Sequence, residues 1–277
     1  MPPKMTLEGY LRRLNDESDK MLGSYEKTLK RAYTSLLRDM NNVISNTYAK
    51  LDDSDLIGSL QKYHRKDNVE QTLTSLINEF SKAKYKGMYD QLREQLLFAY
   101  QYYYTGLTEV SGRKYKLLPL KKEWLTATIE NEIAGLTLKE TLQRDRQNII
   151  YSLKSNLIQG VNRGESFSAM AKRMQKVVNN DYQKAVRIAR TETHRVKEAG
   201  TYESALKGEK AGIKQMKTWN SSNDGRTRKE HRKLDGKTIP MDEYFRVGSA
   251  KALKPGDTGR AEHDINCRCW LSYEIVD

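Results

Sequence analysis

The feature that most constrains this chain is a helical repeat of apolar side chains near its start. From residue 7 to residue 43, a mostly apolar position recurs in ten steps at a mean spacing of 3.6 residues. This is the period of a straight amphipathic helix, and it differs from the 3.5-residue period of a long coiled coil. The stripe consists of Leu7, Leu11, Leu14, Ser18, Leu22, Tyr25, Leu29, Ala32, Leu36, Met40 and Val43.

A second helical run is predicted over residues 56–104. The sequence DDSD at residues 52–55 separates it from the first, and Ser54 or Asp55 is placed to cap it. The run ends at TGLTEVSGRKYKLLPLKKEW, which has two glycines, one proline and no helical period. That composition predicts a loop or short hairpin over about residues 105–122. Helix is expected to resume near residue 122 and, after a glycine, to reach residue 157.

Shorter elements are predicted beyond residue 160. Arg163-Gly164 indicates a turn, and Ser166 or Ser168 is placed to cap the next helix. Residues 180–207 are predicted to form a separate helix. The helical period is lost beyond this point.

Two extended segments follow in the last part of the chain. Residues 212–222, GIKQMKTWNSS, alternate as a strand does, and a short helix and an Asp-Gly turn are predicted after them. Residues 265–276, INCRCWLSYEIV, alternate well enough to predict a final strand. Its inward face would carry Cys267, Cys269, Leu271 and Tyr273.

These patterns together predict an α+β protein with two parts. Residues 1–158 are expected to form a long, mostly helical, elongated N-terminal region that contains the loop near 105–122. Residues 159–277 are expected to form a compact α+β domain with a small sheet.

The net charge of +13 favours an anionic partner, such as DNA or the acidic face of another protein. No run of five or six like charges occurs, so a merely solvated cationic surface is an equal alternative. No apolar stretch reaches the ~18 residues that span a bilayer, so no membrane partner is predicted. The first residues lack a secretory signal, so the chain is expected to start in the cytosol, where its two cysteines stay thiols or act as ligands.

The last third of the chain concentrates polar side chains that an ordinary core avoids. We interpret them as a structural polar network, in which a buried Arg190 or Glu192 would pair with Asp224, Asp235 or Arg228. Asp224 is expected to cap the helix that carries His231, and Asp235-Gly236 to form a tight turn. The network comprises Arg190, Glu192, Asp224, Arg226, His231, Asp235 and Asn266.

A metal site is the alternative interpretation of the same region. Cys267 and Cys269 lie on one side of the predicted strand, and thiolates with the imidazole of His231 suit zinc. His263 is the first candidate for a fourth ligand, with Asp224 and His194 as others. The Cys-x-Cys spacing differs from the usual Cys-x2-Cys pairs, so a metal-free contact between thiols and imidazole stays open, and no cofactor is the primary expectation. His64 and His194 are otherwise expected to be ordinary surface or helix residues.

No enzymatic role is expected. His231, Asp235 and Asn266 offer a base and metal-binding oxygens for a metal-dependent nuclease, but no well-spaced acidic pair accompanies them. The motifs of P-loop enzymes, serine hydrolases and zinc proteases are absent from the sequence. No small-molecule substrate is predicted.

The same region resembles a known family. The segments IARTETHRVKEAGTYESA, KTWNSSNDGRTRKEHRKLDGKTIP and PGDTGRAEHDINCRCW occur in the order found in phage head morphogenesis proteins. These are minor head proteins related to the F protein of phage Mu. The resemblance covers residues 160–277, and it does not require a histidine at position 263. The helical first half carries no motif of the family.

The resemblance implies a structural virion protein of low copy number. Such a protein associates with the portal and with capsid or scaffold proteins, and lies in the capsid interior after assembly in the host cytoplasm. It would support capsid assembly and DNA packaging or delivery, with contact to double-stranded DNA through its basic surface. The alternatives are a DNA-binding protein or a metal-dependent nuclease acting on phage DNA.

Overall fold

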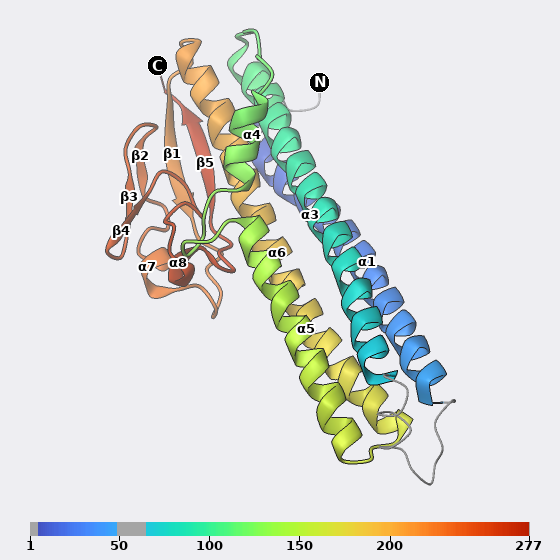
Figure 1. The fold of residues 1–277 in the computed structure, drawn as a ribbon. Coiled ribbons are helices and arrows are strands. Elements are labelled where there is room, and N and C mark those ends of the chain that lie inside the picture. The colour runs from blue at the N-terminus through green and yellow to red at the C-terminus, as the bar shows by residue number, and fades with distance from the viewer. Residues whose placement is uncertain (1–4, 49–64, 277) are drawn as a thin grey trace. The chain divides into compact units, whose positions relative to one another are not determined.

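The computed structural model describes residues 5–48 and 65–276 (Figure 1). Long helices are followed by small antiparallel sheets, so the predicted α+β class is confirmed. The expected break at 52–55 and its cap at Ser54 or Asp55 lie outside the described residues. The elements in chain order are α1 Leu7–Tyr48, α3 Arg65–Ser111, α4 Lys122–Ile129, α5 Leu138–Asn162, α6 Phe167–Lys210, β1 Gln215–Asn220, α7 Lys229–Arg232, β2 Thr238–Pro240, β3 Phe245–Val247, β4 Ala250–Ala252, α8 Ala261–Asp264 and β5 Trp270–Ile275.

The chain forms two compact units, each built from separated stretches. The sheet unit comprises Met1–Tyr25, Tyr89–Leu138 and Arg187–Asp277, and the helix unit comprises Glu26–Met88 and Lys139–Val186. The boundary expected between residues 158 and 159 falls inside α5 and stays a prediction about the sequence. Among the described residues, no helix combines the length and the apolar character needed to cross a bilayer.

The apolar stripe of α1 is buried with one shift of position. Leu7, Leu11 and Leu14 are buried as predicted. Further along, Tyr33 is buried instead of the exposed Ala32, and Ile44 is buried more deeply than Val43. The predicted period therefore holds, since Leu29, Leu36 and Met40 are buried as predicted, and the buried residue is shifted by one only at positions 33 and 44.

Two helix boundaries differ from the prediction. Helix α3 continues to Ser111, beyond the predicted start of the loop at 105, because Gly106 serves close packing and does not end the helix. A Cβ atom there would lie 2.7 Å from Cγ of Tyr10. Helix α6 is one continuous helix, where two were predicted. Tertiary burial of Val178 and Asp181 holds the Asn-Asn sequence between them in helical form.

The start of α6 agrees with the predicted cap. The backbone N–H of Ala169 donates to Oγ of Ser166, 3.4 Å away. The turn before it contains Gly164 with a φ of 64°, a conformation that favours glycine.

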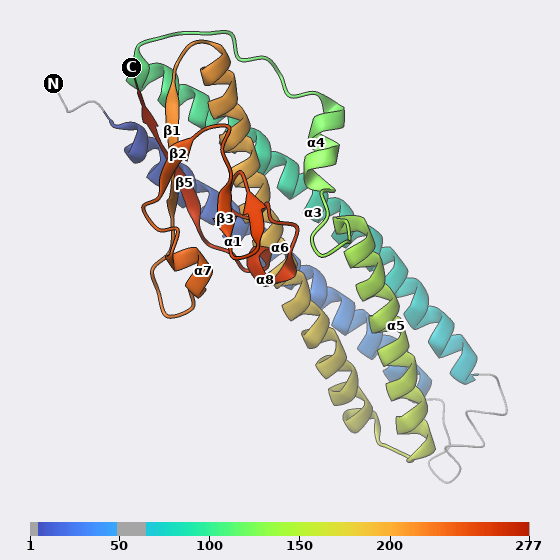
Figure 2. The same cartoon turned by 90° about the vertical axis from the view of Figure 1, so that its left-hand side faces the viewer.

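The principal sheet has the order β2-β1-β5, with every neighbour antiparallel (Figures 1 and 2). Side chains of the central strand β1 alternate, and Gln215, Lys217 and Trp219 face the core. Strands β3 and β4 form a separate two-stranded sheet. The last strand is shorter than predicted, because Asn266 adopts a left-handed conformation with a φ of 58°.

A buried lysine stands in the middle of β1 with its charge satisfied. Nζ of Lys217 donates to the backbone oxygens of Met241 and Leu253, each 2.9 Å away. It also lies 4.9 Å from the ring centroid of Tyr202. Burial lowers the pKa of Lys217 to about 8.

Helices α3 and α6 meet closely at Gly200, within the sheet unit. A Cβ atom at Gly200 would lie 2.4 Å from the backbone oxygen of Leu96 and 3.2 Å from the backbone nitrogen of Tyr100. Backbone atoms inside a helix cannot move aside as a flexible side chain does. The absence of a side chain at this position therefore sets the distance between the two helices.

Replacing Gly200 with alanine is expected to lower the free energy of unfolding of the sheet unit by about 1–3 kcal/mol, because the helices must separate. Urea unfolding followed by tryptophan fluorescence measures this change. Gly23→Ala is the matched control, since nothing lies within 4 Å of its added Cβ. That control should gain roughly 0.5–1 kcal/mol from helix propensity alone. Equal stability of Gly200→Ala and wild type contradicts the tight crossing.

Candidate functional site

Two thiols and one imidazole converge inside the sheet unit. Helix α7 supplies His231, and the segment between α8 and β5 supplies Cys267 and Cys269. Nδ1 of His231 lies 3.3 Å from Sγ of Cys269 and 3.7 Å from Sγ of Cys267. All three residues are buried, and both cysteines are free thiols. We call these three residues the thiol–imidazole cluster.

Two more histidines border the cluster. His194, on α6, lines the same hollow as Cys267, and its Nε2 is buried without a hydrogen-bond partner among the described residues. His263, on α8, has its ring centroid 5.6 Å from that of His231. His194 therefore lies beside the cluster, whereas the sequence suggested an ordinary surface or helix residue. Its participation depends on how α6 is rotated, which the sequence does not reveal. His64 lies outside the described residues.

The two thiols differ in acidity. The hydrogen bond with Cys269 and burial raise the pKa of Cys267. The same hydrogen bond lowers the pKa of Cys269, against the effect of burial, with further help from the indole of Trp219 and the backbone of Ser222. Burial lowers the pKa of His194, which favours its neutral form. Of the two thiols, Cys269 is thus the one whose lowered pKa favours the thiolate.

Glu192 finds its partner on its own helix. Its carboxylate lies 2.6 Å from the guanidinium of Arg195, one turn away, and both are buried. Arg195 also donates to the backbone oxygen of Ile129, 2.8 Å away. Asp224, Asp235 and Arg228, the partners expected for Glu192, are not its partner. Sequence reasoning missed Arg195, although spacing of three residues on a helix indicates such a pair.

Asp224 does not cap the helix that carries His231, contrary to expectation. Helix α7 begins at Lys229, and its N-cap residue is Arg228, without a side-chain cap. The Asp224 carboxylate instead closes a turn with Thr227 and forms a bidentate pair with Arg268, at 2.6 and 2.7 Å. Arg268 holds the pKa of Asp224 well below its usual range.

The other predicted polar residues lie in separate places. Asp235 accepts hydrogen bonds from the backbone of Ser221 and the side chain of Asn223, beside the predicted turn, where Gly236 has a φ of 74°. The backbone N–H of Asn266 donates to Oγ1 of Thr191. Arg190 is exposed, and Arg226 lies 3.8 Å from Asp224. The contacts of these residues form several small groups, and a common packing role for them stays a prediction.

A basic groove opens over the thiol–imidazole cluster, with a volume of about 820 Å³. His194 and Cys267 are part of its lining, so the groove connects the cluster to solvent. Asp19 is its one acidic lining residue. Its basic residues are Arg190, Lys197, Arg226, Arg228 and Arg268.

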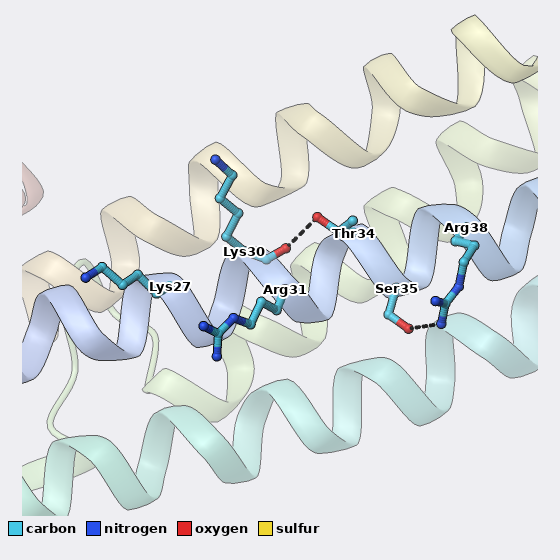
Figure 3. Close-up of a pocket in the computed structure, with 6 residues that line it drawn as sticks. All are labelled: Lys27, Lys30, Arg31, Thr34, Ser35 and Arg38. Carbon is cyan, nitrogen blue, oxygen red and sulfur yellow. Dashed lines mark hydrogen bonds between the residues drawn. The ribbon is translucent and has the colours of Figure 1, made fainter.

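A second cationic surface lies on α1 in the helix unit, and we call it the α1 stripe. Lys27, Lys30, Arg31 and Arg38 line a shallow hollow of about 430 Å³ together with two hydroxyl side chains (Figure 3). Within the described part of the chain, Lys27, Lys30 and Arg31 form no salt bridge. Sequence reasoning missed this surface because it considered only runs of charge, whereas helical spacing gathers these residues on one face.

The chain is similar to known proteins over different parts of its length. Residues 151–272 match the family described as Phage Mu protein F like protein. Over 273 residues the chain is 32% identical to the Minor head protein GP7 of Bacillus phage SPP1, across 93% of this chain and 84% of that protein. Over 158 residues it is 30% identical to the NAD(+)–arginine ADP-ribosyltransferase EFV of Enterococcus faecalis, across 57% of this chain and 32% of that protein. No solved structure matches the chain.

Proposed function

The chain belongs to the family of phage Mu protein F-like proteins, and from this membership we propose that it is a minor head protein with a structural role in head morphogenesis. The observation that carries the proposal is the similarity to the SPP1 minor head protein, which covers 93% of the chain. That alignment extends well beyond residues 151–272, so it includes the long N-terminal helices as well as the domain with the family motifs.

We further propose that the protein is present in few copies in the capsid interior. Its partners are the portal and capsid or scaffold proteins, and its role is to support DNA packaging or delivery. Two surfaces of excess positive charge support this placement, since a protein beside the genome meets phosphate as well as protein.

Co-purification tests the head role. Procapsids and mature virions are purified and analysed by quantitative mass spectrometry, with the portal protein as internal standard. The proposal expects the chain in particles at a copy number near that of the portal, and cross-links to the portal. Its absence from both kinds of particle contradicts the proposal, and cross-links to the major capsid protein alone contradict portal association.

DNA contact is the second candidate function, favoured by the basic groove and the α1 stripe. Arginine and lysine side chains that contact phosphates release counterions, so affinity falls steeply as salt rises. The triple charge reversal of Lys27, Lys30 and Arg31 to glutamate is expected to weaken binding of double-stranded DNA. It should also reduce the slope of log affinity against log salt by about one per lost contact. Fluorescence anisotropy across a salt series measures both quantities.

The matched control reverses three exposed lysines elsewhere, Lys229, Lys237 and Lys251, and changes the net charge equally. If both triple variants weaken binding to the same degree, total charge alone matters and the α1 stripe has no special role. A wild-type affinity that does not change with salt excludes phosphate contact altogether.

We propose no catalytic role for the chain. The name of the second relative refers to a transferase, but the alignment covers 32% of that protein, and its activity is a statement about that protein. For a nuclease, His231 faces the thiols whereas Asp235 binds the loop of Ser221 and Asn223, so the two belong to different groups. A plasmid-nicking assay with added Mg²⁺ or Mn²⁺ tests this view. Nicking by wild type that is lost in His231→Ala contradicts it.

A further inference from the structure

The thiol–imidazole cluster has a ligand geometry that packing alone does not require. One nitrogen and two sulfurs lie within 4.8 Å of one another, all on buried residues. The two sulfurs come from alternate positions on one side of the chain, and the nitrogen comes from a different element, α7. Apolar side chains would fill the same volume without burying three polar groups face to face.

The indole of Trp219 borders the cluster. Its nitrogen is buried and has no hydrogen-bond partner among the described residues. An indole N–H can only donate, so a metal-bound thiolate beside it would offer the acceptor that the described residues do not supply.

The imidazole of His231 is held in the orientation that a ligand needs. Its ring packs edge-to-face against Trp219, with centroids 5.8 Å apart, and Nδ1 points to both sulfurs. Nε2 is buried without a hydrogen-bond partner in the described part of the chain. In the tautomer that carries its proton on Nε2, Nδ1 has a free lone pair and can bind a metal.

We propose that Nδ1 of His231 and the sulfurs of Cys267 and Cys269 bind a zinc ion, with His194 as the fourth ligand. Two thiolates and two imidazoles form a tetrahedral donor set of the kind that structural zinc sites use. Binding displaces the two thiol protons to solvent, and no electron transfer is involved. The ion would join α6, α7 and the segment between α8 and β5, three parts of the chain that are distant in sequence.

The choice of His194 as fourth ligand follows from its neighbours. His194 lines the basic groove together with Cys267, its Nε2 is buried without a hydrogen-bond partner among the described residues, and an ion can enter through this groove. His263 lies beside the ring of His231, with its Nε2 3.9 Å from Glu262. The carboxylate of Asp224 already forms a bidentate ion pair with Arg268, which makes it a poor candidate for the fourth ligand. His263 therefore provides the matched control, as a buried histidine in the same region that is not a ligand.

The test begins with the wild-type chain, purified under reducing conditions without added metal and analysed by mass spectrometry for metals. About one zinc per chain is expected, on the stoichiometry of a single tetrahedral site. The zinc is then removed by a chelator and Co²⁺ is titrated in. Bound Co²⁺ should give a thiolate charge-transfer band and the intense visible bands of tetrahedral cobalt. A wild-type protein that contains no zinc and gives neither band overturns the proposal, and this outcome needs no variant to fold.

Variants then assign the ligands. Cys267→Ser and Cys269→Ser should lose the zinc, and His263→Ala should retain it. His194→Ala should bind zinc more than about 100-fold more weakly, beyond the ~10–100-fold cost of losing a group that only supports a ligand. Zinc retained by Cys269→Ser overturns the site. Full affinity in His194→Ala, with loss in His263→Ala, overturns the assignment of the fourth ligand. None of these outcomes bears on the head role, which particle composition decides separately.

Discussion

Replacing Lys84 with alanine is expected to destabilise the helix unit by about 3–5 kcal/mol. Nζ of Lys84 lies 3.0 Å from the Asp181 carboxylate and 3.1 Å from the hydroxyl oxygen of Tyr33. The two charged side chains are only 1% and 6% exposed. Removing the ammonium leaves Asp181 as a buried charge with the Tyr33 hydroxyl as its remaining donor. In the unfolded chain the Asp181 carboxylate is hydrated, so the loss of its buried partner favours the unfolded state.

Circular dichroism during urea unfolding measures this effect. The chain has three tryptophans, Trp124, Trp219 and Trp270, and all lie in the sheet unit. Ellipticity therefore reports the helix unit along with the rest, while tryptophan fluorescence follows the sheet unit. If ellipticity is lost at a lower urea concentration than the tryptophan fluorescence changes, the helix unit is the part that the substitution destabilises.

Two further variants distinguish the loss of the buried ion pair from the loss of one positive charge anywhere on the helix. Lys82→Ala removes an exposed lysine of the same helix and should change stability by less than about 0.5 kcal/mol. The double variant Lys84→Met with Asp181→Leu should recover most of the loss, because an apolar pair of similar volume avoids desolvation. A Lys84→Ala protein as stable as Lys82→Ala contradicts the importance of the pair.

Replacing Trp219 with alanine is expected to destabilise the sheet unit by about 3–5 kcal/mol. The side chain is fully buried on the central strand β1, and its ring packs edge-to-face against Phe245 with centroids 5.2 Å apart. Its removal leaves a cavity between the sheet and the rest of the core, which the paired strands cannot close.

Urea unfolding of the Trp219 variant is followed by the fluorescence of the remaining two tryptophans. Trp270→Ala is the matched control, since its side chain is only partly buried at the edge of the same core. We expect it to cost less than half as much as Trp219→Ala. Equal losses in the two variants contradict the central place of Trp219.

Local periodicity predicted the elements, and long-range packing decided their details. The 3.6-residue repeat predicted α1, but Ala32 and Tyr33 are neighbours on the helix surface, so the repeat alone does not choose between them. Tyr33 is buried because its hydroxyl binds Asp181, 148 residues away. Lys84 lies 97 residues from Asp181, so no local pattern in the sequence could predict this pair.

The candidate site, too, was predicted in part from local periodicity, while long-range packing determined the rest. Alternation placed Cys267 and Cys269 on one face, and the structure brings them to His231 as the metal interpretation required. Alternation does not predict which helix face packs against that strand. The positions of His194 and Glu198 beside this segment could therefore not be predicted. The Glu198 carboxylate accepts the backbone N–H of Leu271 and thus attaches β5 to α6.

The order in which the chain is made has a consequence for how the two units mature. The helix unit is complete once residue 186 has left the ribosome, and domains generally fold as units during synthesis. The sheet unit requires its first stretch, Met1–Tyr25, to wait until β5 arrives to pair with β1 along the full register from Gln215 to Asn220. Its core is therefore assembled only once β5 has been made, and a nascent chain stalled before β5 is expected to expose its apolar helix faces to chaperones.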